Sequence, residues 1–163
     1  VFLNGCFSQE YSSLANLPRG VRVQSLSESL KSSPDFIEEH LAQHPSNEVF
    51  AALNTAFIED GAVIHLEEGV IVEDPIQLLF FSAANGRPIV SHTRCLVVAD
   101  PNSQAQIVET YTGKQDSIYF MNAVTELFVK NNAAFYLGQN RKHWPLPLLS
   151  SLRVLRFRLV PNK

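Results

Sequence analysis

The sequence predicts a mainly β protein in which short strands follow a short helical segment. Three observations support this fold class. After Asp60-Gly61 the apolar residues recur at every second position, short acidic turns interrupt them, and two strand-like runs repeat at an offset of 30 residues. That offset fits one full coil of a parallel β-solenoid, while periodicity alone also allows an antiparallel sandwich or jelly roll.

Length and composition agree with a folded, soluble domain. The 163 residues can bury a core, and 45% hydrophobic residues with a mean hydropathy near zero are ordinary for a globular protein. No apolar run reaches the roughly 18 residues of a membrane helix, and the first residues do not read as a secretory signal. With only two cysteines, we expect a cytoplasmic protein. Because the chain does not start with Met, we expect a fragment or a processed form.

Charge is unevenly distributed along the chain. All 16 acidic residues lie in residues 1–126 with only 6 Lys/Arg, which gives −10. Residues 127–163 carry 7 Lys/Arg and no acid, which gives +7. The acidic body argues against a nucleic-acid partner.

Residues 1–58 are expected to hold N-terminal strands and short helices. VFLNG and LPRGVRV read as extended runs with Asn-Gly and Pro-x-Gly turns. Ser25 is expected to cap a helix over residues 26–31, with Glu28 in the capping-box position, and Pro34 to open a second helix.

A third helix is expected after residue 47, capped by Ser46 or Asn47. Its apolar residues follow helical spacing, and Gly61 is the expected C-terminal stop. The spaced residues are Phe50, Leu53 and Phe57, with Ala52 and Ala56 beside them.

Residues 59–137 are expected to form the β core. Ala62, Ile64 and Leu66 should face one way, and Val63 and His65 the other. Further strand-like runs cover residues 70–72, 76–82, 89–99, 105–111 and 118–129.

The 30-residue repeat is visible when Asn102 is placed against Asn132. Asn tolerates the left-handed backbone conformation of a tight corner, so both residues are expected at bends. The same offset aligns Val97 with Leu127, Val98 with Phe128, Ala105 with Phe135 and Ile107 with Leu137.

Candidate chemical groups are sparse. His65 and Glu67 would share a strand face, as two metal ligands might need, with Glu68 adjacent. His92 and Cys95 are three apart and should point to opposite faces. The favoured interpretation is structural: His65 as a strand residue, the glutamates as a solvated turn, and both Cys95 and Cys6 as structural residues.

Sequence signatures of common sites are missing. The chain has no Cys-x-x-Cys, no glycine-rich phosphate loop and no Gly-x-Ser-x-Gly. Asp74, Asp100 and Asp116 fall in turns, where Asp is common for conformational reasons. We therefore predict no catalytic, cofactor-binding or metal-binding residues, and no enzyme activity.

Several segments, in this order, resemble the SufD family and, more loosely, SufB, which are scaffold subunits of iron-sulfur cluster assembly. The resemblance covers about residues 1–135, and the N-terminal segment favours SufD over SufB. The segments are VFLNGCFS, LPRGVRVQSL, FAALNTAFIEDGAVIHLEEGVIVEDPI, LLFFS, SHTRCLVVADPNSQ and NAVTE.

The resemblance implies a right-handed parallel β-helix that associates with SufB through the β-helices, in a complex with the ATPase SufC. A homodimer is a further option. In the family, the SufC-docking helices and the residues that handle the nascent cluster lie in the C-terminal half, so none is carried onto this chain. We expect no bound cofactor, no nucleic acid and no membrane.

Residues 138–163 are expected to be a divergent tail. The family pattern is lost from about residue 136, where the charge also changes sign. An aberrant and disordered segment is the favoured explanation; a genuine divergent tail or a basic membrane-surface segment are alternatives.

Two other functions fit a β scaffold. One is a carbohydrate-active β-helix enzyme, which needs charged residues clustered on one sheet face. The other is a metal-binding jelly roll that uses His65, Glu67 and His92.

Overall fold

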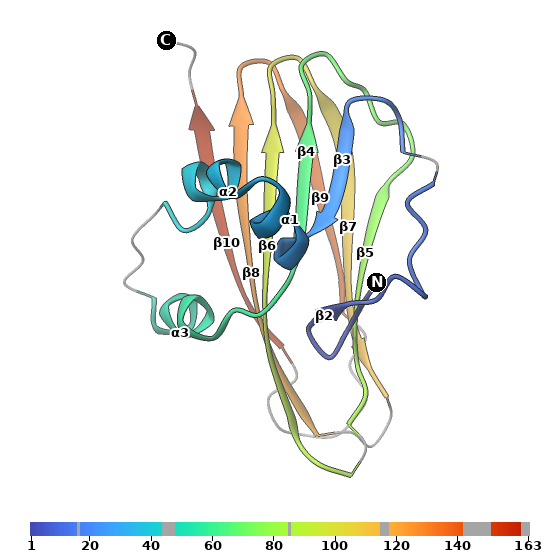
Figure 1. The fold of residues 1–163 in the computed structure, drawn as a ribbon, viewed down its shortest axis with the longest axis vertical. Coiled ribbons are helices and arrows are strands. Elements are labelled where there is room, and N and C mark those ends of the chain that lie inside the picture. Colours follow the sequence, from blue (N-terminus) through green and yellow to red (C-terminus); the bar gives the residue numbers. More distant parts are fainter. Residues whose placement is uncertain (16, 44–47, 85, 115–117, 142–150, 161–163) are drawn as a thin grey trace.

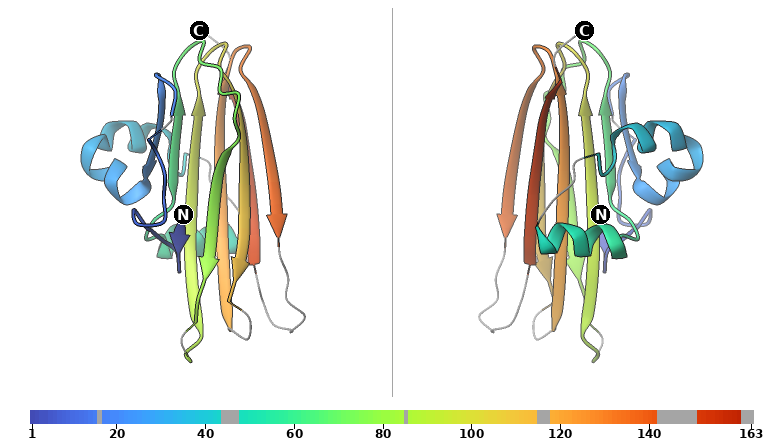
Figure 2. Two further views of the ribbon diagram at one scale, coloured as in Figure 1. Left: turned by 90° about the vertical axis from the view of Figure 1, so that its right-hand side faces the viewer. Right: turned by 90° about the vertical axis from the view of Figure 1, so that its left-hand side faces the viewer.

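The computed structural model describes the chain except residues 16, 44–47, 85, 115–117, 142–150 and 161–163. The fold is mainly β, with two five-stranded sheets that face each other and helices that cover the outer side of one of them (Figures 1 and 2). The first sheet has the order β2-β1-β5-β7-β9, and the second has the order β10-β8-β6-β4-β3. The mainly β class is therefore confirmed.

Most neighbouring strands are parallel, because the chain alternates between the two sheets. In the first sheet, β5 (Ile76–Ser82), β7 (Gln104–Gly113) and β9 (Ala134–Arg141) are parallel neighbours. In the second sheet, β4 (Ala62–Leu66), β6 (Ile89–Ala99), β8 (Tyr119–Lys130) and β10 (Ser151–Val160) are parallel neighbours. Antiparallel sandwiches and jelly rolls lack this pairing.

The 30-residue repeat corresponds to strand pairing. Every aligned pair forms a pair of strand neighbours: Val97 with Leu127, Val98 with Phe128, Ala105 with Phe135 and Ile107 with Leu137. The corners also agree, since Asn102 and Asn132 have φ of 61° and 55°, and the Asn132 Nδ2 donates to Asn102 Oδ1 over 3.4 Å. The prediction of asparagine at left-handed corners is confirmed.

Among the described strands, antiparallel pairing occurs only at the N-terminal ones. β1 (Phe2–Leu3) and β2 (Cys6–Phe7) form a hairpin, and β1 continues the first sheet beside β5. β3 (Val21–Ser25) closes the second sheet against β4. Phe2, Phe80 and Tyr111 stack in a column across three strands, with ring centroids 4.9 and 4.8 Å apart.

The main core lies between the sheets. Ala62, Ile64 and Leu66 point into it, while Val63 points to the outer face under the helices, as the period-two pattern predicts. The second, smaller core joins that outer face to the helices. Its buried residues are Leu26, Ile37, Val63, Leu96, Val98 and Phe128.

Two of the helices begin as the sequence predicts. α1 (Leu26–Ser32) is capped by Ser25, whose Oγ accepts from the Glu28 backbone N–H over 3.1 Å. α2 (Pro34–His40) has its proline in the first turn.

The third helix, α3 (Val49–Phe57), differs from its prediction in two ways. It faces the sheet through Ala51 and Asn54, so Phe50 and Phe57 stay exposed. The helix also ends before Gly61, which therefore is not its C-terminal stop. Gly61 instead lies against the backbone of β6, where a Cβ would come within 1.9 Å of the Arg94 carbonyl oxygen. The expected caps Ser46 and Asn47 lie outside the described residues.

Two further expectations differ from the structure. The run at residues 70–72 makes only an isolated bridge from Ile71 to Gln104. The supposed disordered tail begins with the end of β9 and includes β10, which pairs along β8 from Met121 to Lys130. An apolar segment interspersed with arginines, beside a strand whose edge would otherwise be open, favours this pairing over disorder. The division of the chain at residues 58 and 137 stays a prediction, as does winding into a right-handed β-helix.

Candidate functional site

The residues selected from the sequence do not come together. His65 Nε2 lies 2.9 Å from Asp100 Oδ2, and Lys130 Nζ lies 2.7 Å from Asp100 Oδ1. Glu67 and Glu68 are exposed at the following turn. Across the described part of the chain, no three or more His, Cys, Asp or Glu residues are grouped to hold a metal ion. The described structure therefore does not bring His65, Glu67 and His92 together around a possible metal site.

Asp100 holds this small charged group together at a corner of the second sheet. Burial is the largest influence on its carboxyl pKa and raises it, but hydrogen bonds and charge from Lys130 and His65 outweigh burial and lower the pKa below its ordinary value. The three side chains come from β4, from the corner after β6 and from the end of β8, so the group links neighbouring strands at one corner. This arrangement suits a structural role for His65.

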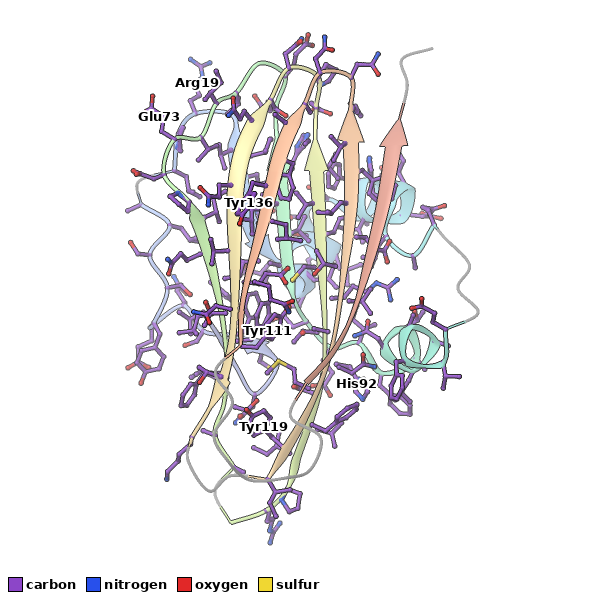
Figure 3. The ribbon with its side chains drawn as sticks, turned by 180° about the vertical axis from the view of Figure 1, so that it is seen from behind. Arg19, Glu73, His92, Tyr111, Tyr119 and Tyr136 are labelled. Atoms are coloured by element: carbon purple, nitrogen blue, oxygen red, sulfur yellow. The ribbon has the colours of Figure 1, made fainter. Side chains whose placement is uncertain are left out.

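His92 and Cys95 point to opposite faces of β6, as predicted. Cys95 is 1% exposed in the core between the sheets. His92 lies on the outer side near α3 (Figure 3), where desolvation lowers its pKa against the opposing charge of Glu59. Cys6 is exposed, and desolvation, then Glu59 and Asp60, raise the pKa of its thiol, so the thiol form is favoured.

The most unusual arrangement in the structure is a buried ion pair on the outer face of the second sheet. Arg94 on β6 and Glu126 on β8 are each 1% exposed, and the Arg94 Nη2 bonds Glu126 Oε1. Charges are this deeply buried only when they are paired and hydrogen-bonded. We define the ion pair, its side-chain partners Asn54 and Thr55, and Asn122, to which Asn54 bonds, as the polar network.

The ion pair connects the sheet to the helical segment. Arg94 Nη1 donates to Asn54 Oδ1 over 3.2 Å and to Thr55 Oγ1 over 2.8 Å, both on α3. Glu126 Oε2 accepts from the backbone N–H of Ala42 over 3.0 Å. Ala42 has φ of 58°, a left-handed conformation that is unfavourable for alanine. The carboxylate therefore holds the turn that follows α2.

Asparagine side chains complete the polar network. The Asn54 Nδ2 donates to the carbonyl oxygens of Thr93, over 2.9 Å, and of Asn122, over 2.8 Å. The Asn122 Nδ2 donates to the carbonyl oxygen of Phe50 over 2.7 Å. Helix α3 is thus attached to two neighbouring strands through hydrogen bonds in both directions. Both charges are paired and shielded from water, which suits attachment rather than proton transfer.

A second buried carboxylate lies between the sheets. Glu109 on β7 is fully buried, and its two oxygens accept from Thr125 Oγ1 over 2.8 Å and from the Tyr111 hydroxyl over 2.9 Å. The bond from Thr125 connects β8 to β7 across the core, while Tyr111 belongs to the same strand as Glu109. Glu109 therefore joins the two sheets at one level of the interior.

The Asp60 carboxylate connects three N-terminal elements through hydrogen bonds. Its carboxylate accepts from the backbone N–H groups of Phe7, Ser27 and Gly61 over 2.8, 3.2 and 2.8 Å. One buried side chain thereby joins the β1–β2 hairpin, the start of α1 and the start of β4. Sequence reasoning used Asp60 only to mark the junction at Asp60-Gly61 where the apolar period changes to two.

Sequence reasoning also missed Arg94, Glu126, Glu109 and Asn54. The available signal was a polar residue inside an otherwise apolar run, as in TRCLVV, VTELFV and AALNTAF. Partners up to 84 residues apart, such as Ala42 and Glu126, cannot be paired by local spacing.

Two family matches cover most of the chain. Residues 1–78 match the SufBD protein N-terminal region, and residues 80–143 match the SufBD core domain of the SUF system for FeS cluster assembly. The second match extends past residue 136, where the sequence was expected to leave the family pattern. None of the described helices is long and apolar enough to cross a bilayer.

Individual relatives agree with these matches. The iron-sulfur cluster assembly SufBD family protein slr0076 of Synechocystis is 34% identical over 98% of this chain and 39% of its own length. Protein ABCI7, chloroplastic, of Arabidopsis thaliana is 31% identical over 82% of this chain and 29% of its own. Iron-sulfur cluster assembly protein SufB of Bacillus subtilis is 31% identical over 69% of this chain and 24% of its own. The chain thus spans well under half the length of the relatives it matches.

Proposed function

The chain belongs to the SufBD family of the SUF iron-sulfur cluster assembly system, and we propose that it serves there as a non-catalytic scaffold segment of the SufD type. The observation that carries the proposal is the agreement between the family matches and the structure. Both the N-terminal region and the core are matched, and the strands of the matched core stack at the 30-residue spacing.

The stacked strands support a parallel β-helix as the architecture of this scaffold. Strands of the two sheets alternate along the chain, corners recur at Asn102 and Asn132, and parallel neighbours are one repeat apart. Such a wall is stiff because each coil hydrogen-bonds to the next along its length. Its right-handedness follows from the general preference for right-handed crossovers between parallel strands.

The polar groups also support a structural role. The Arg94–Glu126 pair, Glu109 and Asp60 each bond to at least two separate elements and are buried. Groups of this kind fix helices and strands in one arrangement. A nascent cluster would be the cargo of the assembly and not a resident cofactor of this chain.

The proposed partners are a SufB-type subunit and the ATPase SufC, within a cytoplasmic complex. Among the described strands, β9 and β10 lie at the open edges of the two sheets. Open edges present unpaired backbone groups that can continue into a partner's sheet. We therefore expect SufB to be contacted directly and SufC to be recruited with it.

A co-purification experiment tests the proposal. The tagged 163-residue chain is co-expressed with untagged SufB and SufC of the same source, and the eluate is analysed by mass spectrometry and for iron. We expect SufB to be retained, SufC to be retained only when SufB is present, and the isolated chain to carry no stoichiometric iron.

Two variants make the result interpretable. His65→Ala should retain SufB, because within the described part of the chain the His65 side chain contacts a corner carboxylate and the ring of Phe36. Val97→Asp should unfold the chain and lose SufB. A folded wild-type chain, verified by circular dichroism, that retains neither partner contradicts the proposal, as does stoichiometric metal that His65→Ala removes.

A further inference from the structure

A pocket of about 470 Å³ lies where α3 meets β6 and β8. We call it the α3 pocket. It adjoins the polar network, which lies under the same helix and contacts the pocket through Asn122 and His92. Its lining is mostly apolar or aromatic: Leu53, Phe57, Glu59, Val90, His92 and Phe120. Figure 3 shows His92 at this place, beside α3.

Aromatic rings line the pocket, and two of its apolar residues are highly exposed. The ring of Phe57 lies 5.6 Å from that of His92, and Phe120 lies 6.4 Å from His92 on another side. Phe57 is 59% exposed and Val90 is 61% exposed. Exposed apolar residues gathered at one place indicate a contact surface. Phe57 is exposed because α3 docks on the sheet through Ala51 and Asn54 instead.

The pocket carries one negative charge. Glu59 is exposed at its rim, and no ion pair of Glu59 occurs among the residues that the structure describes. His92 does not balance this charge at neutral pH, because desolvation lowers its pKa. The Asn122 Nδ2 lies 3.3 Å from His92 Nδ1, which makes Nδ1 an acceptor of a neutral ring.

We propose that the α3 pocket binds an arginine side chain of a partner protein. Aromatic faces attract a cation, and a planar guanidinium can stack on Phe57 or Phe120 while its N–H groups bond the Glu59 carboxylate. Apolar neighbours of the arginine would cover Val90. A purely apolar partner fits less well, since covering Glu59 without a cation leaves its charge desolvated and unpaired.

The probe is the peptide acetyl-Leu-Arg-Leu-amide, and the control peptide has citrulline in place of arginine. Citrulline keeps the shape and most hydrogen-bond donors but has no charge. Binding to the full 163-residue chain is followed by chemical-shift changes of the His92 and phenylalanine ring signals. We expect the arginine peptide to bind at least about fivefold more tightly, the effect of roughly one surface ion pair.

Matched variants locate the site. Glu59→Gln should reduce arginine-peptide binding to the citrulline level and leave citrulline binding unchanged, while Glu68→Gln, at a distant exposed turn, should change neither. Phe57→Leu keeps apolar area but removes the ring, and should weaken the arginine peptide more than the citrulline peptide. Melting curves verify that the variants are folded. Equal binding of the two peptides, no response to either, or an equal effect of Glu68→Gln overturns the proposal.

Discussion

The two faces of β6 and β8 are built from different chemistry although they share a backbone. On the inner face, Cys95, Val97 and Leu127 pack into an apolar core between the sheets. On the outer face, Arg94, Glu126 and Asn122 sit among apolar neighbours and bond to the helices. Each strand thus stacks on its parallel neighbour and also holds the helical layer.

The difference teaches that stacking and attachment depend on different forces. Apolar burial drives the inner face, is non-directional and tolerates similar side chains. Hydrogen bonds to a buried ion pair act on the outer face, are directional and become unfavourable when one partner is removed. A change on the inner face should therefore affect the whole fold, and a change on the outer face should mainly affect the attachment of the helices.

Placing a charge on the inner face should have the largest effect. Val97→Asp buries an unpaired carboxylate between the sheets and should cost more than about 4 kcal/mol, enough to unfold most of a typical domain. Ile64→Asp should behave alike. Circular dichroism and thermal melting measure the loss of structure and of stability. Val90→Asp, at an exposed position of the same strand as Val97, is the control. Unchanged melting of both core variants would show the inward assignment to be wrong.

Breaking the ion pair should have the next largest effect. Glu126→Ala leaves Arg94 buried without its carboxylate and frees the backbone N–H of Ala42, so we expect a loss of about 3–5 kcal/mol. The double variant Arg94→Met with Glu126→Leu removes both charges and should recover most of that loss. Denaturant unfolding gives the free energies. A double variant as unstable as Glu126→Ala alone would contradict the account of the outer face.

Asn54→Ala should detach α3 without unfolding the sheets. It removes two hydrogen bonds to strand carbonyls and the bond from Arg94, and we expect a loss of about 1–3 kcal/mol. Hydrogen exchange should increase in residues 49–57 and stay slow in β6 and β8. Ala56→Ser, at an exposed position of the same helix, is the control. Uniformly faster exchange in both sheets would mean that attachment and stacking are not separable.

A substitution at Asn132 tests the corner between β8 and β9. Asn132 has positive φ, so Asn132→Val should cost about 1–2 kcal/mol while Asn132→Gly should be close to neutral. Asn131→Val, one residue away and without positive φ, is the matched control. Thermal melting distinguishes them, and equal melting temperatures for the two valine variants would argue against a left-handed corner at residue 132.

The smallest expected effect is a pH dependence from His92 on the outer face. Desolvation lowers its pKa below 6.5 in the folded state, against the charge of Glu59, so the unfolded chain binds the proton more tightly. Its contribution to stability is complete above pH 6.5 and is lost as the pH falls toward the folded pKa. His92→Gln should remove this slope between pH 5 and 7, the range about the ordinary His pKa. A slope unchanged by the substitution would assign it to other groups.

The stacked part of the fold was largely predictable from the sequence. A period of two, turn residues and one aligned pair of asparagines were enough to predict the strands at residues 89–99 and 105–111. They also predicted the 30-residue register that pairs these strands with β8 and β9. These signals are local, because each strand alternates between core and outside within a few residues.

The attachment of the helices was not predictable. Helix α3 looked like a helix that buries phenylalanines, yet its contact with the sheet is made by Ala51 and the hydrogen bonds of Asn54. Arg94 and Glu126 look like polar interruptions of strands until the fold brings them together. Likewise, the alternating residues 151–160 resembled a stray tail because their partner strand lies 30 residues earlier.

The central claim is that successive strands of each sheet stack in parallel, about one repeat apart, around a mainly apolar interior. Methyl-labelled NMR tests it directly, since neighbouring strands lie about 4.8 Å apart and facing methyl groups should give nuclear Overhauser effects. The account predicts cross-peaks between Val97 and Leu127 and between Ile107 and Leu137, and their joint loss on Val97→Asp. A folded chain in which these pairs are silent and β6 shows an antiparallel pattern of contacts to β8 would contradict it.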